Sequence, residues 1–266
     1  MSIQFQNISY KINNQFLVKN INLRIRPGEI HVLLGKNGAG KSTIFKLLCG
    51  DIEPNIGEIF INDKNLNTYN VKSLSTIRSV LTQEYDLNFP FSVSEIVALG
   101  RMPFPYVKEK NEMIIQETLD ITSIQHLGER DYNTLSGGEK QRTQLSRVLT
   151  QIWDSPDKYI FLDEPTSGMD LPNQIKTLEI SKQMAEQGYG VFIILHDINL
   201  AFQYADTISL IKNGSIYVSG DPSLSLNEEI LSDVYDIPIH IIQNKHHTFI
   251  LAKQTTKEQL YEFNTR

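Results

Sequence analysis

One short stretch constrains the fold of this chain more than any other. The letters GKNGAGKST, from Gly35 to Thr43, follow the apolar run HVLL. They precede a segment in which Ile44, Leu47 and Leu48 recur with the period of a helix. The stretch fits the pattern G-x-x-x-x-G-K-[ST] in the strand–loop–helix context that this pattern requires. It therefore predicts an α/β fold in which a strand delivers the chain into a glycine-rich loop and a helix.

The composition of this loop suits it to holding phosphate groups. Its glycines let backbone N–H groups approach an anion without a Cβ clash, and the helix N-terminus adds a favourable dipole. Lys41 is suited to the β- and γ-phosphates of a nucleotide, and Ser42 to Mg²⁺. A glycine-rich turn without a ligand is the alternative, which the complete motif disfavours. We expect the nucleotide-binding residues to be Gly35, Lys36, Asn37, Gly38, Ala39, Gly40, Lys41, Ser42 and Thr43.

A second motif ends a buried strand in two acids. The stretch YIFLDEP, from Tyr159 to Pro165, places Asp163 and Glu164 directly after an apolar run. Buried carboxylates are costly unless they meet a cation, so we expect Asp163 to face Mg²⁺. Glu164 points elsewhere and is suited to activating a water molecule as a general base. Two acids that cap a following helix are the alternative, which the upstream phosphate motif makes less favoured.

Composition and patterning narrow the class of protein. The chain has 266 residues, a net charge of −6 and a pI near 5.6, which argues against a nucleic-acid binder. Its one cysteine, Cys49, excludes an internal disulfide and fits a reducing compartment. The N-terminal residues show no signal-peptide pattern, and no apolar run approaches the roughly 18 residues of a bilayer span. Apolar runs at 160–162 and 191–195 predict strands buried on both faces of a parallel sheet.

The stretch TLSGGEKQRTQLSRV, from Thr134 to Val148, carries a second helix start that is suited to an anion. A serine and two glycines precede a helical pattern, although the chain already has a phosphate loop. Together with GKNGAGKST, Gln83, FLDEPTSGMD and His196 in ILHD, in this order, it resembles the ATP-binding subunits of ABC transporters. The resemblance covers about residues 3 to 220. It implies an ATPase with a P-loop NTPase core, a mostly parallel sheet, an N-terminal antiparallel β subdomain and an inserted helical subdomain.

The resemblance also implies how the two anion sites are used. ATP-binding subunits of this family pair head to tail, so we expect a homodimer in which each chain completes the other's site. Ser136, Gly137 and Gly138 are expected to contact the nucleotide that the partner holds. Asp170, in SGMD, corresponds to a loop that also reaches across the dimer. The family more often has alanine and leucine where Gly168 and Met169 stand, and we expect this change to be tolerated.

Further roles follow from the resemblance, residue by residue. Gln83 corresponds to the glutamine that senses Mg²⁺ and the attacking water, and His196 to the histidine that contacts the γ-phosphate. Glu164 and these two residues form the expected catalytic set, and Ser42, Gln83 and Asp163 the expected Mg²⁺ set. The family usually stacks an aromatic side chain on adenine near the end of the first strand. Ile12 stands there in this chain, with Tyr10 two residues earlier, so adenine stacking is weak or falls to Tyr10.

The resemblance divides the chain into a core and an insert. We expect one ABC ATPase domain over 1–266, with the nucleotide-binding core at 1–83 and 153–266. The helical subdomain is expected at 84–152. The aromatic and proline residues at its start are expected to contact a membrane partner, although packing inside the insert is the alternative; they are Tyr85, Phe89, Pro90 and Phe91.

The segments around the insert resemble a group of importers for metal chelates. The letters TQEYDLNFPFSVSEIVALGR are similar to the insert of ATPases that serve haem, ferric siderophore and cobalamin importers. The spacer DSPD and the letters QIW before it are most similar to haem-import ATPases. This implies haem uptake through permease subunits at the cytoplasmic face of the inner membrane, with a substrate-binding protein as an indirect partner. Siderophore or cobalamin import is the alternative. His246 and His247, neighbours in a polar tail, are expected to be solvated rather than haem ligands.

Three other classes of ATP-using protein are less favoured. A DNA-repair or chromosome ATPase would place a long coiled coil between the two glycine-rich motifs, but only about 95 residues separate Lys41 from Ser136. A translation-type factor usually carries two such cassettes, and this chain carries one. A small-molecule kinase would show nucleotide consumption stimulated by an acceptor in solution and would not need two copies.

Overall fold

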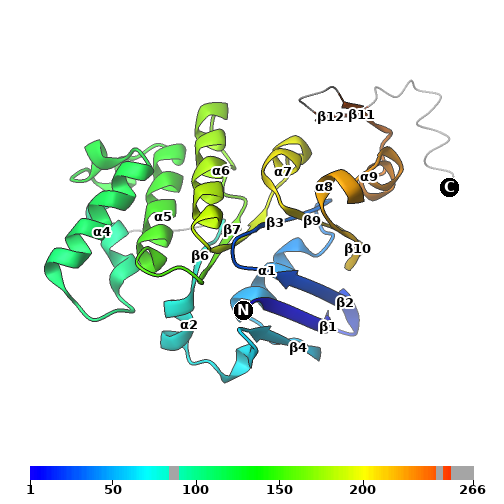
Figure 1. The fold of residues 1–266 in the computed structure, drawn as a ribbon, viewed down its shortest axis with the longest axis horizontal. Helices are drawn as coiled ribbons and strands as arrows, with labels where there is room; N and C mark the ends of the chain where they lie inside the picture. The colour runs from blue at the N-terminus through cyan, green and yellow to red at the C-terminus, as the bar shows by residue number, and fades with distance from the viewer. Residues whose placement is uncertain (84–89, 244–247, 253–266) are drawn as a thin grey trace.

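The computed structural model describes residues 1–83, 90–243 and 248–252 of the chain. Its largest sheet has six strands in the order β10-β9-β3-β8-β7-β6. All neighbours in this sheet run parallel except β9 and β10, which form a hairpin. The expected α/β fold with a mostly parallel sheet is confirmed (Figure 1). The six strands are β3 (Ile30–Gly35), β6 (Arg78–Leu81), β7 (Tyr159–Asp163), β8 (Gly190–Ile194), β9 (Thr207–Lys212) and β10 (Ser215–Gly220).

The central strands are buried on both faces, as the apolar runs predict. Because successive residues of a strand point to opposite faces, Val32 and Leu34 join one apolar cluster and Leu33 joins another. The first cluster includes residues of α5, α6 and α7, and the second includes α1 and the N-terminal strands. Helices therefore cover one face of the sheet, and α1 with the N-terminal sheet covers the other (Figure 1). These helices are α1 (Lys41–Cys49), α5 (Gly137–Ile152), α6 (Leu171–Glu186) and α7 (Ile198–Tyr204).

The N-terminal residues form a separate antiparallel sheet in the order β2-β1-β4-β5. Its first hairpin turns at Asn13 and Asn14, whose positive φ angles of 47° and 65° suit asparagine at the turn. The expected N-terminal antiparallel β layer is thus confirmed. The strands are β1 (Ile3–Ile12), β2 (Gln15–Ile25), β4 (Ile56–Ile61) and β5 (Lys64–Asn65).

The C-terminal part adds a hairpin and a small outlying unit. Asn213 and Gly214 turn β9 into β10 with φ angles of 49° and 76°, as the letters Lys-Asn-Gly predict. Two helices and two strands follow, and the second helix and both strands pack onto the cluster that lies under α6 and α7. His246 and His247 lie outside the described residues. The elements are α8 (Pro222–Ser225), α9 (Glu228–Tyr235), β11 (Ile239–Gln243) and β12 (Thr248–Ala252).

A group of helices stands at one end of the sheet and has an apolar cluster of its own (Figure 1). The cluster joins residues of α3 and α4 with the loop before α5, including Val93, Leu119 and Leu135. Among the described residues, no helix is both long and apolar enough to cross a membrane. The helices between β5 and α5 are α2 (Val71–Ile77), α3 (Val93–Ala98) and α4 (Lys108–Ile121), together with the short 3-10 helices η1 (Leu66–Thr68), η2 (Leu99–Arg101), η3 (Gln125–Leu127) and η4 (Tyr132–Thr134).

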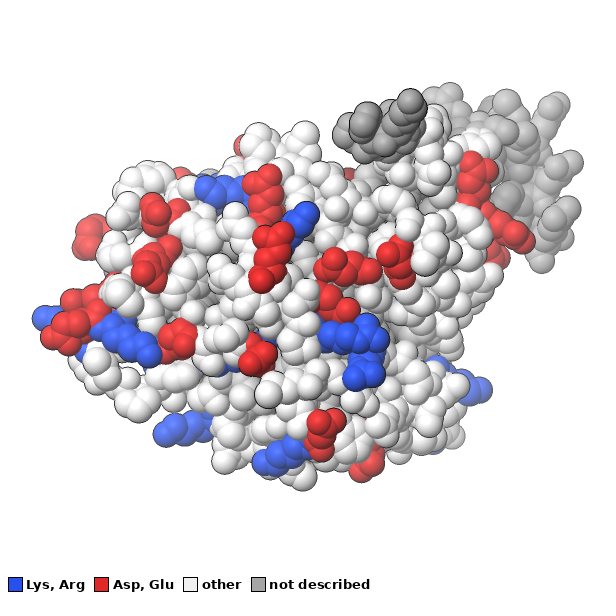
Figure 2. Space-filling model, viewed as in Figure 1, with Lys and Arg blue, Asp and Glu red and all other residues white. Residues whose placement is uncertain are grey.

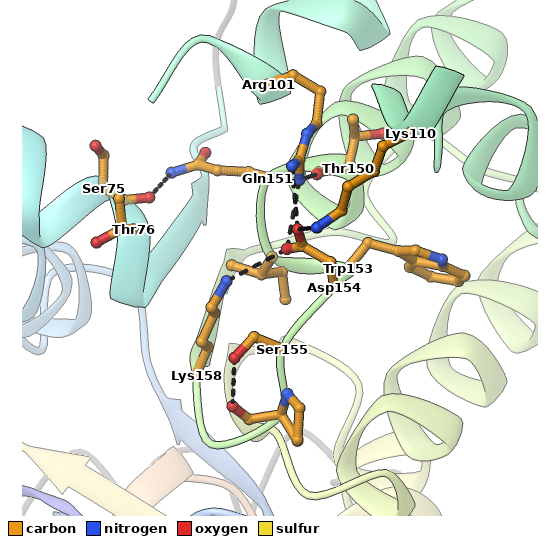
Figure 3. Close-up of polar contacts among 12 residues, drawn as sticks. Ser75, Thr76, Arg101, Lys110, Thr150, Gln151, Trp153, Asp154, Ser155 and Lys158 are labelled. Carbon is orange, nitrogen blue, oxygen red and sulfur yellow. Dashed lines mark hydrogen bonds and ion pairs between the residues drawn. The ribbon is translucent and has the colours of Figure 1, made fainter. Parts of the chain in front are cut away.

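The joint between these helices and the sheet is built around one carboxylate (Figure 3). Asp154, which opens the DSPD spacer, accepts from Arg101 at 3.1 Å and from Lys110 at 2.7 Å, and lies 3.6 Å from Lys158. The Arg101 side chain is only 6% exposed and also donates to the carbonyl of Thr150 at 3.1 Å. Arg101 and Lys110 belong to the helical group, whereas Lys158 precedes β7. Asp154 therefore ties the helices to the strand that ends in the acid pair.

Replacing Asp154 with alanine should destabilise the fold by about 3 kcal/mol, because it leaves Arg101 buried without a counter-ion. Urea unfolding measures the change, and Glu112→Ala, which removes the exposed Lys108–Glu112 pair, should change stability by less than about 1 kcal/mol. Equal losses in the two variants would contradict this role for Asp154.

The contribution of Asp154 should also depend on pH. Burial alone would raise the pKa of this carboxyl, but hydrogen bonds from Lys110 and Arg101 hold it well below its ordinary range. Because the pKa is lower in the folded chain, the stabilisation is fully present above the unfolded pKa of about 3.9. It is lost as the pH falls from there through the folded pKa. Acid titration of the unfolding free energy should show a steeper fall for the unmodified chain than for the alanine variant.

Candidate nucleotide site

The phosphate loop (Gly35–Thr43) joins the end of β3 to the start of α1 and is shaped by its glycines. Gly38 and Gly40 have φ angles of 78° and 111°, in a region that other residues rarely adopt. A Cβ at Gly40 would lie 2.9 Å from Cγ1 of Val18, and one at Gly35 would lie 2.5 Å from the carbonyl oxygen of Ile211. Gly40 also caps α1 without a side-chain hydrogen bond, so the first N–H groups of the helix point into the loop. The backbone is thus arranged for an anion.

Lys41 is held inside the curve of this loop. Its side chain is buried, and its Nζ donates to the carbonyl oxygens of Gly35 at 2.7 Å and Lys36 at 3.1 Å. Burial lowers the pKa of the ammonium, while Glu164 and Asp163 favour its charged form. The positive charge is therefore fixed close to the acid pair.

A cavity of about 330 Å³ lies against the phosphate loop. Glu164 belongs to its wall, so the acid pair and the loop share one space. Leu17, on β2, also lines it; sequence reasoning missed this residue, because an apolar strand residue carries no signal of a ligand. The lining residues are Leu17, Asn37, Gly38, Gly40, Lys41, Ser42, Thr43 and Glu164.

The expected adenine contacts lie on β1, which pairs with the strand that carries Leu17. Tyr10 is half-buried and packs against the N-terminal core, whereas the side chain of Ile12 is 49% exposed. The ring of Tyr10 is thus used in packing. The aliphatic side chain of Leu17, by contrast, lines the cavity beside the phosphate loop.

Asp163 ends β7 as a half-buried acid whose charge is not fully compensated by protein groups. Burial and, to a smaller extent, the adjacent Glu164 raise the pKa of its carboxyl to about 6, against the opposing effect of Lys41. A bound cation would favour the ionised form and reverse this shift. The Ser42 hydroxyl, the Gln83 amide oxygen and the Asp163 carboxylate are the hard oxygen donors that Mg²⁺ prefers. The donor set therefore fits the metal that the motif implies.

Glu164 is held between two polar side chains that follow neighbouring strands. Its Oε1 lies 2.5 Å from Nε2 of His196, and its Oε2 accepts from Nε2 of Gln83 at 3.0 Å. Gln83 follows β6, Glu164 follows β7 and His196 follows β8, so the carboxyl ends of three parallel strands bring them together. Glu164 also has a φ angle of +50°, which is unusual for a side chain with a Cβ. Such strain is typical of functional positions.

The serine–glycine start of α5 (Ser136, Gly137, Gly138) does not line the cavity of the phosphate loop. Ser136 caps the helix with a capping box, accepting from the backbone N–H of Glu139 and donating to its carboxylate. A second cavity, of about 320 Å³, is lined by Gln83, Gly137, Gln141, Ser167 and Gly168. Within the part of the chain that the structure describes, neither cavity joins the serine–glycine start to Lys41. The serine–glycine start and the phosphate loop of one chain thus line different cavities.

Asp170 caps α6 and ends the loop that follows the acid pair. Its carboxylate accepts from the backbone N–H of Asn173 at 3.3 Å. Gly168 has a φ angle of +69°, which glycine adopts without strain, and Met169 is 8% exposed. The glycine and methionine that replace the more usual pair therefore supply a turn and an apolar anchor just before Asp170.

Comparison with known proteins places these features in a family. Residues 18–167 match the family model described as ABC transporter. The chain is 41% identical over 244 residues to the Hemin import ATP-binding protein HmuV of Pseudoalteromonas translucida, covering 90% of this chain and 94% of that protein. It is 40% identical to the protein of the same name from Aliivibrio fischeri, covering 88% and 90% of the two chains.

Two solved structures share the fold over most of their length. A metal-chelate type ABC transporter in an inward-facing conformation superimposes with a TM-score of 0.79 and 26% identity, over 97% of this chain and 98% of that one. The dimeric ABC transporter cassette MJ0796 gives a TM-score of 0.73 and 26% identity, over 83% and 98%. The order of motifs, the fold and these matches agree, and the chain belongs to the ABC transporter family as one of its ATP-binding ATPase subunits.

Proposed function

We propose that this chain hydrolyses ATP to drive the import of haem through a partner permease. The hydrolytic part rests on one observation: Glu164 is held between Gln83 and His196 on the wall of the cavity that contains the phosphate loop. The cargo rests on the extended similarity to proteins named for hemin import. Import of a ferric siderophore or cobalamin is the alternative, and the similarity to a metal-chelate type transporter supports the wider class.

The residues of the site divide the work of hydrolysis. The phosphate loop and Lys41 hold the β- and γ-phosphates and offset their charge. Ser42, Gln83 and Asp163 would hold Mg²⁺, which supplies a positive charge to the phosphate oxygens. Glu164 orients the attacking water and accepts its proton, since its carboxylate is the basic group nearest the loop cavity. His196 holds Glu164 through Oε1, and in the proposed complex it would contact the γ-phosphate.

The second half of each site is proposed to come from a second copy of the chain. Ser136, Gly137, Gly138 and Asp170 would contact the nucleotide that the partner holds. This is supported by the different cavities that the serine–glycine start and Lys41 line within one chain, and by the similarity to a dimeric cassette. Two copies then form two shared sites, which accounts for two anion-binding motifs in one sequence.

The remaining partners are proposed to be membrane proteins. Permease subunits would hold the pair at the cytoplasmic face of the inner membrane, and a substrate-binding protein would act through them. Of the expected contact residues, Pro90 is exposed and Phe91 is half-buried, while Tyr85 and Phe89 lie outside the described residues. We do not propose a nucleic-acid partner, because acidic and basic side chains are scattered over the face in Figure 2 rather than gathered into a basic patch.

Glu164→Gln should bind ATP but lose hydrolysis by a factor of about 10² to 10⁴, because the amide cannot accept the proton of water. With ATP present the variant should remain a dimer, which light scattering after size exclusion measures beside phosphate release. Glu186→Gln, an exposed change at the end of α6, is the matched control and should behave as the unmodified chain. Normal phosphate release from Glu164→Gln would remove this residue from the role of base.

Ser136→Arg should abolish hydrolysis while each chain still binds ATP, since the bulky cation blocks only the partner's site. Lys41→Ala should also be inactive, because its own phosphate loop is impaired while its serine–glycine start is intact. Mixing the two variants should restore activity, because one site of the mixed dimer then has both an intact phosphate loop and an intact serine. Ser92→Arg, which breaks the equivalent capping box of α3, controls for the lost cap. A mixture that stays inactive would show that the site is not shared.

Haem should stimulate hydrolysis by the complete transporter more than a ferric siderophore or cobalamin does. The measurement is phosphate release from the chain assembled with its permease in vesicles that contain the substrate-binding protein. Stimulation by cobalamin or siderophore alone would select the alternative cargo and leave the ATPase proposal intact.

A further inference from the structure

We propose that Arg142 and Asn173 form a hydrogen-bonded relay that fixes Asp170 relative to the serine–glycine start of α5. The relay makes the two elements that face the second copy move as one unit. It rests on the proposed shared site, and it adds two positioning residues, neither of which touches the nucleotide. Neither residue was singled out from the sequence.

The relay runs through three side chains on two neighbouring helices. Arg142 lies in the second turn of α5, and its Nη1 donates to Oδ1 of Asn173 at 2.5 Å. Asn173 lies in the first turn of α6, and its Nδ2 donates to Oδ1 of Asp170 at 2.5 Å. The Asn173 amide thus accepts from α5 and donates to the loop that precedes α6. An asparagine is suited to this position, because its amide offers an acceptor and a donor at once.

The Arg142 guanidinium makes this contact although one of its N–H groups is left without a hydrogen bond within the described part of the chain. Its Nε is buried and has no hydrogen-bond partner among the described residues. An unpaired buried N–H group is unfavourable, and an arginine free to reach water would avoid it. The position of Arg142 is therefore better explained by the hydrogen bond from its Nη1 than by solvation of its charge.

The part of the loop at Thr166 and Met169 is held by α6 itself, whereas Asp170 is linked to α5. Gln174 donates to the carbonyl oxygens of Met169 at 3.0 Å and Thr166 at 3.5 Å, and Thr177 donates to the Met169 sulfur at 3.6 Å. These contacts fix the backbone of the loop from within one helix. The Asp170 side chain is held by the backbone N–H and by the side-chain amide of Asn173, and the amide is the group that links it to Arg142.

A second, weaker contact links the same two elements. Gln141, beside Arg142 on α5, donates to the carbonyl oxygen of Glu164 at 3.5 Å. Helix α5 therefore contacts the start of the 164–170 segment through Gln141 and its end through the relay.

The functional consequence follows from the geometry of a shared site. Ser136 begins α5 and Asp170 begins α6, so both must reach the partner's nucleotide when the dimer closes. If the two elements moved separately, closing of the dimer would have to order each of them, at a cost in conformational entropy. A rigid spacing lowers this entropic cost and keeps both residues in register with the partner's nucleotide.

Asn173→Ala should lower kcat for ATP hydrolysis by about tenfold or more, because Asp170 keeps only its backbone cap and is no longer held in register with α5. KM for ATP measured on the same variant should change by less than about twofold, since the phosphate loop is untouched. The matched control is Lys176→Ala, which removes another contact of α6 with the helical group, the hydrogen bond to Ser123. It should leave kcat unchanged.

Asn173→Asp separates the relay from a merely structural role. The carboxylate still accepts from Arg142, as a stronger charge-assisted bond, so the melting temperature should not fall below that of the unmodified chain. The donor to Asp170 is lost and replaced by a like charge, so kcat should fall as far as in Asn173→Ala. Normal hydrolysis by Asn173→Asp would overturn the relay, since a contact that only stabilises the fold survives in it.

A double-mutant cycle tests the link to α5. If the relay is one unit, Arg142→Ala should reduce kcat as Asn173→Ala does, and the double variant should be no slower than either. A loss of kcat in the double variant equal to the product of the single losses would overturn the relay.

Asp170→Ala distinguishes the proposed shared site from the proposed relay. Full activity in Asp170→Ala would refute its role in the shared site, whereas an impaired Asp170→Ala beside a normal Asn173→Ala would refute the relay alone.

Discussion

The burial of three neighbouring parallel strands on both faces is the constraint on which the rest of the structure depends. Strands β3, β7 and β8 pass between two apolar layers, where a charged side chain would be costly. Charge therefore gathers where these strands end. The phosphate loop follows β3, the acid pair ends β7 and His196 follows β8, so the same edge of the sheet holds Lys41, Asp163 and Glu164 close together. Burial at this edge raises the pKa of Asp163 and lowers the pKa of Lys41. The attraction between the ammonium and the two carboxylates opposes both shifts.

Strain and hydrogen bonds at that edge support each other. Glu164 has a positive φ angle, and its side chain is nevertheless held from both sides by Gln83 and His196. A flexible carboxylate would sample many positions, whereas one held at both oxygens offers a fixed direction to a water molecule. The same two contacts link Glu164 to the ends of β6 and β8, so a displacement of either strand would also displace the carboxylate.

Helix α5 joins this chemical edge to the helical group. Its apolar residues Leu145, Val148, Leu149 and Ile152 belong to the core under the sheet, while its serine–glycine start faces outward. The cluster around Asp154 fixes its far end against β7, and Arg142 contacts α6 near its beginning. The helix is thus held at both ends by polar contacts and along its length by packing. Motion of the helical group should consequently be transmitted to the elements that follow β7.

The sequence by itself determined the family, the α/β architecture and the elements that carry the motifs, because these depend on local spacing and apolar periodicity. The phosphate loop, the capping of α5 by Ser136 and the turn at Asn213 are local features that residue type alone specifies. Only the tertiary structure decided which side chains meet. The contacts of Glu164 with Gln83 and His196, the pairing of Asp154 with Arg101 and the bond between Arg142 and Asn173 join residues that lie 31 to 81 positions apart. Such contacts depend on strand order and helix packing, and no period or spacing in the letters encodes those distances. For the same physical reason the positive φ of Gly168 and the place of Leu17 on the cavity wall became visible only in the folded chain.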